Sequence, residues 1–514
     1  MASNYSKSLY NQYEEVLNEL EEHKKLLKET SNLVKSLNKT VEELNKTIEK
    51  QNKIIEEQAQ EILRLKSKNN KDSSNSSKPS GTNGYKKVIT NRREKSTRKQ
   101  GGQINHIAHS LKKKLNKFIN SGNVQEEIIE INKNDNNKNK RYIEKVVIDI
   151  KITKHIKRYR YYPYEDGKYN IPDCHNQYVQ YGNNIKAITI DLMNNLPNST
   201  DGVVTFISDI TNKGITLSKG TLINWNSELS NKLSNEINYI ENELLNSYYL
   251  NHDESQIKID SENYNVLCAC NDKYVRLWPS KNKSQKAIDE IGFLPKFKGV
   301  IVKDGTELYN KYGCFLSQCI SHIQRYLKGI YDFIKHEGPK KLSDFFSKYN
   351  DLRNKYINEN KESFSNEEYN NIIIEYDSIL NEWERELRED TDNYLFDDEL
   401  KLFTRLKYDN KNMNNKIRGD RDEVLYFLKD FNVPATNNNA ESSQRGVKIK
   451  QKIGKFRSVG GSESYLRIKS CILTYKKQNK DILNALANAF EETRSCQVWC
   501  VNFHLFFKFS KNIS

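Results

Sequence analysis

A seven-residue hydrophobic repeat runs through residues 10–66. Apolar or aromatic side chains recur at every seventh position, namely Tyr13, Leu20, Leu27, Val34, Val41, Ile48, Ile55 and Ile62. The positions three residues later are mixed, since some are apolar and others are His, Thr or Gln. A sustained repeat of seven without Gly or Pro is typical of a left-handed coiled coil. We therefore predict a coiled coil over residues 1–67 that joins two copies of the chain. The alternative is an amphipathic helix that packs on its own domain.

The pattern of apolar positions stops abruptly after the repeat. Residues 68–102 are rich in Ser, Asn, Lys, Arg and Gly, and they contain few apolar side chains. The basic residues here include Lys86, Lys87, Arg92 and Arg93, which we expect to contact an anionic partner. This composition predicts a disordered linker with a basic arm that follows phosphates. A solvated linker without a partner fits the same residues.

Residues 103–245 have the pattern of a smaller mixed region. A run of β-branched residues predicts a strand over Val146–Ile156, and an aromatic stretch, Tyr159–Tyr164, follows it. Thr205–Asn212, Gly214 and Ser218–Leu229 predict a helix, a turn and a second helix, with Ser218 as its N-cap. In a helix-turn-helix the groove-facing residues would be Lys219, Thr221 and Asn224. A helix pair that only packs has the same pattern.

Composition adds an anionic partner to this picture. The chain has 83 Lys and Arg against 68 Asp and Glu, a formal net charge of +15, which favours nucleic acid as the partner. The sequence offers no apolar stretch long enough for a membrane span. Met1–Tyr10 lacks the apolar core of a secretory leader, and the 8 cysteines are scattered. We therefore expect a reducing cytoplasmic location and no disulfide framework.

Three acidic residues have contexts that suit catalysis. Tyr248–Leu250 leads into Asp253, which predicts an acid at the end of a short strand, and the apolar run Val300–Val302 leads into Asp304. Glu441 opens a stretch compatible with a helix. Three neighbouring carboxylates repel one another unless divalent cations neutralise them, and hard oxygen ligands suit Mg²⁺ or Mn²⁺. Taken singly, each of these acids has the features of an ordinary surface carboxylate.

Two further patterns complete this half of the chain. Residues 340–430 are rich in helix formers and charges, which predicts a helical insertion between Asp304 and Glu441. Cys314, Cys319 and His322 would serve as metal ligands only with a fourth group, so we interpret them as core residues. His322 and Arg325 are one helical turn apart, so both are expected to face the same site.

Several motifs, in order, resemble the insertion-sequence-66 family of bacterial transposases. They are Asn75–Pro79, Gly101–Gln103 with His106, Tyr181-Gly182 with Leu217–Thr221, His252–Ser255, Lys303–Gly305 with Tyr309, Cys319 with His322 and Arg325, Asn437–Glu441 with Arg445, and a tail of Ser470, Thr474 and Asn479. The resemblance spans nearly the whole chain. It implies an α/β RNase H-like catalytic core over residues 246–514, preceded by the coiled coil and by a DNA-binding region over residues 103–245.

The resemblance also implies a chemistry and a set of roles. Asp253, Asp304 and Glu441 would be the catalytic acids that hold two Mg²⁺ or Mn²⁺ ions for DNA cleavage and strand transfer. Arg325 and Arg445 would contact DNA phosphates, with His322 and Cys319 in support. The partners would be double-stranded DNA, as terminal inverted repeats and target, and accessory proteins encoded by the same element. The location would be the nucleoid of a bacterial or archaeal cell.

One stretch departs from the family pattern. Family members carry a small zinc module before the middle region, but here Tyr159–Tyr169 contains no cysteine, and only Cys174 and His175 lie nearby. Four ligands for a closed zinc site are not available locally, so we expect no structural zinc and propose that tyrosine packing replaces it. Two alternative functions therefore stay open: a catalytically silent DNA-binding protein descended from a transposase, and an RNase H-like host nuclease.

Overall fold

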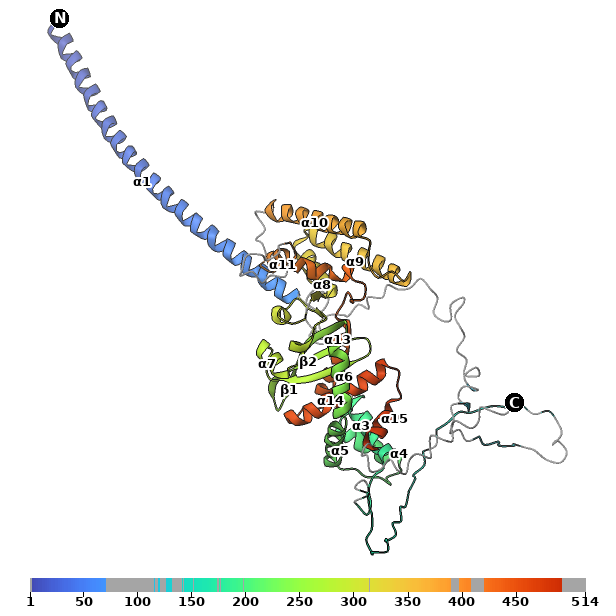
Figure 1. The fold of residues 1–514 in the computed structure, drawn as a ribbon. Helices are drawn as coiled ribbons and strands as arrows, with labels where there is room; N and C mark the ends of the chain where they lie inside the picture. Colours follow the sequence, from blue (N-terminus) through green and yellow to red (C-terminus); the bar gives the residue numbers. More distant parts are fainter. Residues whose placement is uncertain are drawn as a thin grey trace.

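This computed structural model describes residues 2–70, 126–131, 143–150, 152–172, 177–196, 198–313, 315–389, 397–407 and 420–491, with a few isolated positions between them. Within these residues a mixed sheet forms the middle of the body, and helices surround it (Figure 1). The basic residues Lys86, Lys87, Arg92 and Arg93 lie outside the described residues.

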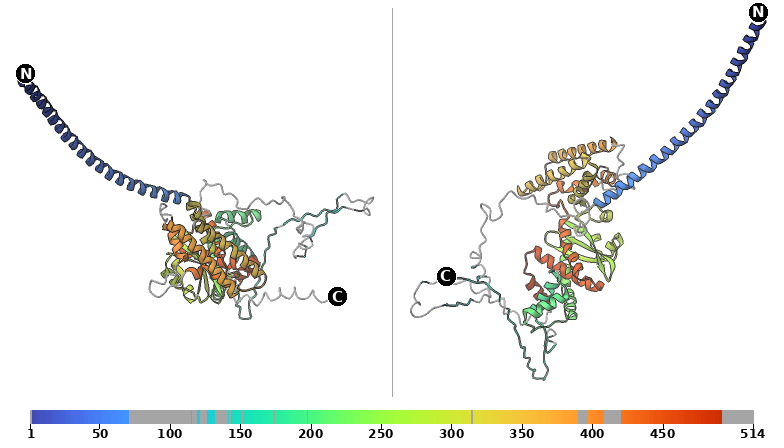
Figure 2. Two further views of the ribbon diagram at one scale, coloured as in Figure 1. Left: turned by 90° about the horizontal axis from the view of Figure 1, so that it is seen from above. Right: turned by 180° about the vertical axis from the view of Figure 1, so that it is seen from behind.

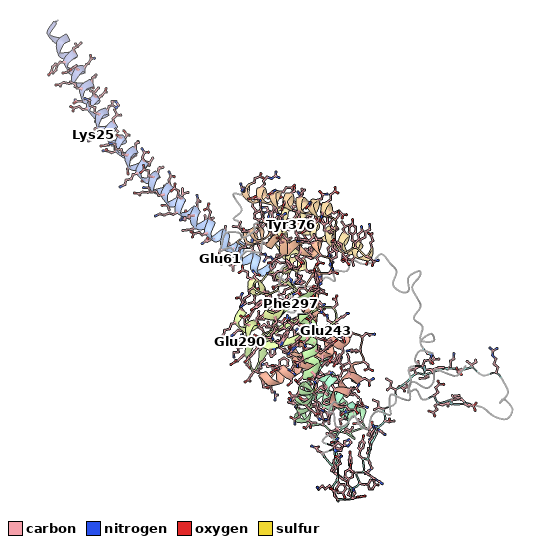
Figure 3. The ribbon with its side chains drawn as sticks, in the orientation of Figure 1. Lys25, Glu61, Glu243, Glu290, Phe297 and Tyr376 are labelled. Carbon is pink, nitrogen blue, oxygen red and sulfur yellow. The ribbon has the colours of Figure 1, made fainter. Side chains whose placement is uncertain are left out.

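The heptad segment forms one long helix, α1 (Ala2–Asn70), as its periodicity predicts. The helix projects away from the rest of the chain in every view (Figures 1 and 2). Its apolar seventh positions are exposed, from 48% of Leu20 to 70% of Leu27. Side chains, among them those of Lys25 and Glu61, line the length of the helix (Figure 3). None of the described helices, α1 included, is long and apolar enough to cross a membrane.

A five-stranded mixed sheet is the centre of the fold. Its strands are β1 (Tyr249–Ile259), β2 (Glu262–Cys270), β3 (Val275–Ser280), β4 (Val300–Lys303) and β5 (Phe315–Gln318). Their order is β3-β2-β1-β4-β5. β1, β2 and β3 form an antiparallel meander, whereas β4 pairs parallel to β1 and β5 pairs parallel to β4. The central strand β1 therefore has an antiparallel neighbour on one side and a parallel neighbour on the other.

Two helices after the insertion cover the sheet. α13 (Asn438–Ile453) packs Ala440 and Val447 against the face that carries Cys268. α14 (Val459–Lys477) lies along the edge strand β3. Its Ser470 and Thr474 hydroxyl groups accept hydrogen bonds from the backbone N–H groups of Leu277 and Val275, at 3.0 Å each. The two hydroxyls thus satisfy donors that the open edge of a sheet would leave unpaired.

A helical layer precedes the sheet in sequence and shares its core. It consists of α3 (Asn183–Asn194), α4 (Thr200–Ile210), α5 (Lys219–Lys232) and α6 (Ser234–Leu245), with α15 (Ile482–Glu491) packed against α3. The predicted helix, turn and helix over α4 and α5 are confirmed. Ser218 caps α5 by accepting a hydrogen bond from the Thr221 N–H at 3.0 Å. The residues that α5 buries are Leu222, Trp225 and Leu229, as expected for one apolar face, together with Asn226 and Ser230.

The predicted insertion is helical. After α8 (Ile320–Ile334), it contains α9 (Glu337–Asn358), α10 (Asn366–Glu389), α11 (Asp397–Lys407) and α12 (Asp420–Lys429). These helices enclose a second core of large aromatic side chains that includes Trp383 and Tyr376, the latter labelled in Figure 3. The insertion and the helices α3 to α5 lie at opposite ends of the body, with the sheet between them (Figures 1 and 2).

A buried ion pair joins the insertion to the sheet. Lys303, the last residue of β4, is 3.2 Å from Glu423 of α12, and both side chains are almost fully buried. The Lys303 ammonium also donates to the Thr306 carbonyl and to Asn310 Oδ1, and Gln318 of β5 donates to Glu423. Removal of one partner of such a pair leaves an uncompensated charge, so the pair fixes where α12 lies against β4 and β5.

The prediction of a strand at Val146–Ile156 is wrong. The described residues of this stretch form no strand, and Val147 and Ile150 are 86% and 84% exposed. β-branched residues favour a strand only where another strand supplies the hydrogen-bond ladder. No strand of the described chain pairs with these residues.

Thr474→Val tests the protection of the edge strand. The substitution preserves shape but removes the acceptor of the buried Val275 N–H, so we expect the free energy of unfolding to fall by about 1–3 kcal/mol. Chemical denaturation measures this loss. Thr205→Val, at an exposed position of α4, is the matched control. Equal stability of the two variants would contradict the role of the Thr474 hydroxyl.

Candidate active site

Asp253 lies inside the central strand β1 rather than at its end. β1 continues to Ile259 because β2 pairs with it along this length, so the expectation of a short strand ending at the acid is wrong. The parallel neighbour β4 does end here. The last pair between these strands is Asn251 with Val302. Two residues further along each chain are Asp253 and Asp304, so parallel pairing brings both acids to the same level of the sheet.

Asp304 occupies the turn that directly follows β4, as its sequence context predicts. Its Oδ1 accepts a hydrogen bond from the Thr306 N–H at 3.1 Å, which orders the turn. A Cβ atom on Gly305 would lie 2.5 Å from Nη1 of Arg405, so the guanidinium group packs against the glycine backbone. Arg405 belongs to α11, and the insertion therefore contributes a cationic side chain next to the second acid.

Glu441 lies in the first turn of α13, as expected, where the helix dipole favours a carboxylate. The fully buried Asn437 positions this helix end. Its side-chain amide donates to the His252 carbonyl at 2.8 Å, and its Oδ1 accepts from the Asn251 amide at 3.0 Å. Gln444, one turn into α13, donates to the Asp253 carbonyl at 2.9 Å. α13 is thus tied to β1 at Asn251, His252 and the first acid itself.

His322 and Arg325 both face the third acid, as their spacing predicts. His322 Nε2 is 3.5 Å and Arg325 Nη2 is 3.4 Å from Glu441 Oε1. Burial and the Arg325 charge lower the pKa of His322 by more than Glu441 and Asp304 raise it. His322 is therefore a neutral neighbour near pH 7, and Arg325 is the cation that balances Glu441.

Cys319 supports this corner as a buried core residue. It precedes α8 as the N-cap and is 1% exposed. Its Sγ accepts a hydrogen bond from the Asn437 N–H at 3.1 Å. The thiol thus packs α8 against the residue that positions α13, which agrees with its interpretation as a core residue. Cys314 lies outside the described residues.

Burial and neighbouring carboxylates together change the proton affinity of Asp253. Burial, followed by the charges of Glu254, Asp304 and Glu441, raises the pKa of Asp253 from 3.8 to about 8. A carboxyl group in such surroundings binds a proton or a cation more readily than one in water. The shift shows that the three acids expected from the sequence share one electrostatic environment.

A fourth carboxylate belongs to this environment, and sequence reasoning missed it. Glu254 follows Asp253 on β1 and points to the opposite face of the sheet, where its side chain is 4% exposed. It accepts a hydrogen bond from the Tyr309 hydroxyl and forms an ion pair with Lys283. Glu254 lies within the matched His252–Ser255 motif, which was a usable signal. Nothing in the sequence pattern singles out Lys283 or Arg405.

The residues expected to bind DNA are spread over other surfaces. Lys219 and Asn224 are exposed on α5, and Lys219 forms a 2.6 Å ion pair with Asp201. Thr221 is half-buried, and its hydroxyl contacts that of the capping Ser218 at 2.9 Å. Arg445 is exposed on α13, one turn after Glu441. Among the residues predicted to bind DNA phosphates, Arg325 alone contacts an acid of the site in the described structure.

The donor set fits divalent cations in chemistry. In the described part of the chain, no three His, Cys, Asp or Glu side chains are arranged so that they could hold a metal ion as they stand. The carboxylates are nevertheless hard oxygen ligands, and the Asn251 Oδ1 and Gln444 Oε1 atoms beside them are buried without hydrogen-bond partners. Glu441 contacts Arg325 in this arrangement.

The stretch that departs from the family's zinc pattern carries an aromatic cluster. The Tyr161 hydroxyl hydrogen-bonds to Nδ1 of His175, and the rings of Tyr159 and His175 are 4.2 Å apart. Cys174 lies outside the described residues. The replacement of zinc by tyrosine packing stays a prediction.

Asp253→Asn tests the raised pKa. Between pH 4 and 8 the folded chain binds a proton at Asp253 that the unfolded chain releases, so the free energy of unfolding falls as pH rises through this window. We expect the variant, without divalent ions, to be more stable than the wild type at pH 8 by about 1 kcal/mol or more, and equally stable below pH 4. Thermal melts at both pH values measure this. Asp332→Asn, at an exposed position of α8, is the control, and an equal gain there would contradict the prediction.

Comparison with known proteins supplies the family. No curated protein matches the chain. The family model described as Transposase IS66 family matches residues 206–463, just over half of the chain. The match begins in α4 and ends in α14, and it contains Asp253, Asp304 and Glu441. The chain therefore belongs to the IS66 family of transposases.

Proposed function

We propose that this transposase cuts DNA at the ends of its element and transfers the strands with a DDE site formed by Asp253, Asp304 and Glu441. The observation that carries the proposal is the meeting of β1 and β4. Parallel pairing brings Asp253 and Asp304 to one level, and Asn437 and Gln444 fix the helix that supplies Glu441. The raised pKa of Asp253 supports the proximity of all three.

Two Mg²⁺ or Mn²⁺ ions, held by these three carboxylates when bound, would activate the attacking water or 3′-hydroxyl and stabilise the leaving oxygen. The chain's own residues prepare this chemistry. Arg325 balances Glu441 until the carboxylate turns toward the other acids. The same guanidinium would then donate to a phosphate, for which its planar fork is well suited. Neutral His322 adds a polar side chain beside Glu441 without adding a second positive charge.

We infer that the sheet and its helices form an RNase H-like core within residues 246–514. The support is the mixed five-stranded sheet, with one acid on the central strand, one after its parallel neighbour and one on a covering helix. The insertion over about 340–430 would help hold the DNA end, and Arg405 supports this role because it reaches Gly305. The basic arm with Lys86, Lys87, Arg92 and Arg93, the exposed Lys219 and Asn224 of residues 103–245, and Arg445 would contact the repeats and the target.

We also propose that α1 forms a coiled coil with a second copy of the chain. Each of its apolar seventh positions is about half exposed or more, which is costly along a helix of this length in water. Pairing of two copies would bury the stripe and bring two active sites to one pair of element ends. Action on DNA in the cytoplasm, at the nucleoid, and accessory proteins from the same element remain predictions.

Asp304→Asn tests the catalytic assignment. The variant removes one acid of the cluster while keeping its shape, so we expect retained binding of duplex DNA but a loss of Mg²⁺-dependent cleavage by at least about 100-fold. A gel-shift assay measures binding and a nicking assay measures cleavage of the DNA that flanks the coding sequence, with Glu441→Gln beside it. Asp332→Asn is the matched control and should cut like the wild type. Undiminished cleavage by Asp304→Asn would overturn the proposal.

Val34→Glu combined with Val41→Glu tests the coiled coil. Charges at two apolar seventh positions would repel across the seam, so we expect the dimer to dissociate at micromolar concentrations. Sedimentation equilibrium gives the mass. The control pair, Asn32→Glu with Lys39→Glu, changes the polar side of the same turns and should leave the dimer intact. A monomeric wild type would refute the assembly.

A further inference from the structure

Lys283 is a cation on the far side of the acid cluster from Arg325. It lies in the loop between β3 and α7 (Gln285–Ile291), and its side chain is about half exposed, at 48%. Its ammonium pairs with the almost fully buried Glu254, which the Tyr309 hydroxyl holds from the other side. Tyr309 is itself fully buried, and its ring packs 4.7 Å from that of His252. Two buried side chains, those of Glu254 and Tyr309, thus hold the exposed ammonium group of Lys283 in place.

The position of this ammonium matters because β4 ends at Lys303. Asp253 and Glu254 point to opposite faces of β1. Beyond the end of β4, no strand among the described residues lies beside β1 on that side. The charges of Asp304 and Asp253 act on Lys283 as well as that of Glu254. Burial alone would lower the pKa of Lys283, but these carboxylates raise it above its usual value, so the group stays protonated. Lys283 and Arg325 therefore bracket the acids from the two faces of the sheet.

We propose that Lys283 binds a backbone phosphate of the DNA strand that enters the catalytic site, with Glu254 and Tyr309 as its positioning residues. An ammonium group has three donors, so Lys283 can keep its contact with Glu254 while it donates to a phosphate oxygen. The buried Glu254 carboxylate holds the exposed Lys283 ammonium in place. This ammonium supplies a fixed positive charge beside carboxylates that would otherwise repel the DNA backbone. The inference rests on the proposed function, since it presumes that DNA enters this site.

The salt dependence of DNA binding tests this inference directly. The probe is a synthetic duplex with the sequence that flanks the coding region, titrated with full-length protein at several salt concentrations without divalent ions. Loss of one phosphate contact should reduce the slope of log K against log salt by about 0.9. We expect Lys283→Ala to show this loss and Lys283→Arg to retain the wild-type slope. Tyr309→Phe should weaken binding but keep the slope, because the ammonium remains.

The same loop provides the control. Lys281 is more exposed, at 58%, and pairs with Glu262, away from the acids. Lys281→Ala should bind with the wild-type slope, and thermal melts confirm that each variant is folded. An unchanged slope in folded Lys283→Ala, or an equal loss in Lys281→Ala, would overturn the inference while wild-type cleavage still supports the catalytic proposal. Absence of DNA binding by the wild type would instead refute the proposed function itself.

Discussion

The gathering of carboxylates in a buried position at the end of β4 is the constraint on which the rest of this structure depends. Burial, followed by the charges of Glu254, Asp304 and Glu441, raises the pKa of Asp253 to about 8. Placing these carboxylates together destabilises the fold, so stability alone does not explain their arrangement. The cations around them, Arg325 at Glu441 and Lys283 at Glu254, lower the cost on each face of the sheet. The cluster is thus tolerated because flanking charges and a rigid sheet hold it.

Buried polar contacts hold together the elements that supply these acids. Asn437 ties the start of α13 to β1 through two hydrogen bonds and to α8 through Cys319. Lys303 and Glu423 do the same for the insertion. Unlike apolar packing, such contacts are directional, and an element shifted out of place would leave a buried donor or charge unpaired. Directional contacts therefore set the geometry of the site, while the apolar cores provide most of the stability.

The insertion is more than a spacer between the second and third acids. Its aromatic core folds α9 to α12 into one body, and α12 is fixed against β5 and β4. Arg405 of α11 consequently lies over Gly305, next to Asp304, although 100 residues separate it from that glycine in sequence. A side chain at Gly305 would push the guanidinium away. The glycine after the second acid thus leaves room for a cationic side chain of the insertion beside Asp304.

Local patterns determined much of this protein in advance. The heptads predict α1, the apolar run before Asp304 predicts β4, and the ordered motifs indicate the family and three candidate acids, because periodicity and short motifs depend on neighbours along the chain. Tertiary structure alone decided the length of β1, the failure of Val146–Ile156 to form a strand, and the contacts of Glu254, Lys283 and Arg405. A strand forms only where a partner completes its hydrogen bonds, and an ion pair only where the fold brings distant charges together. No local pattern encodes either event.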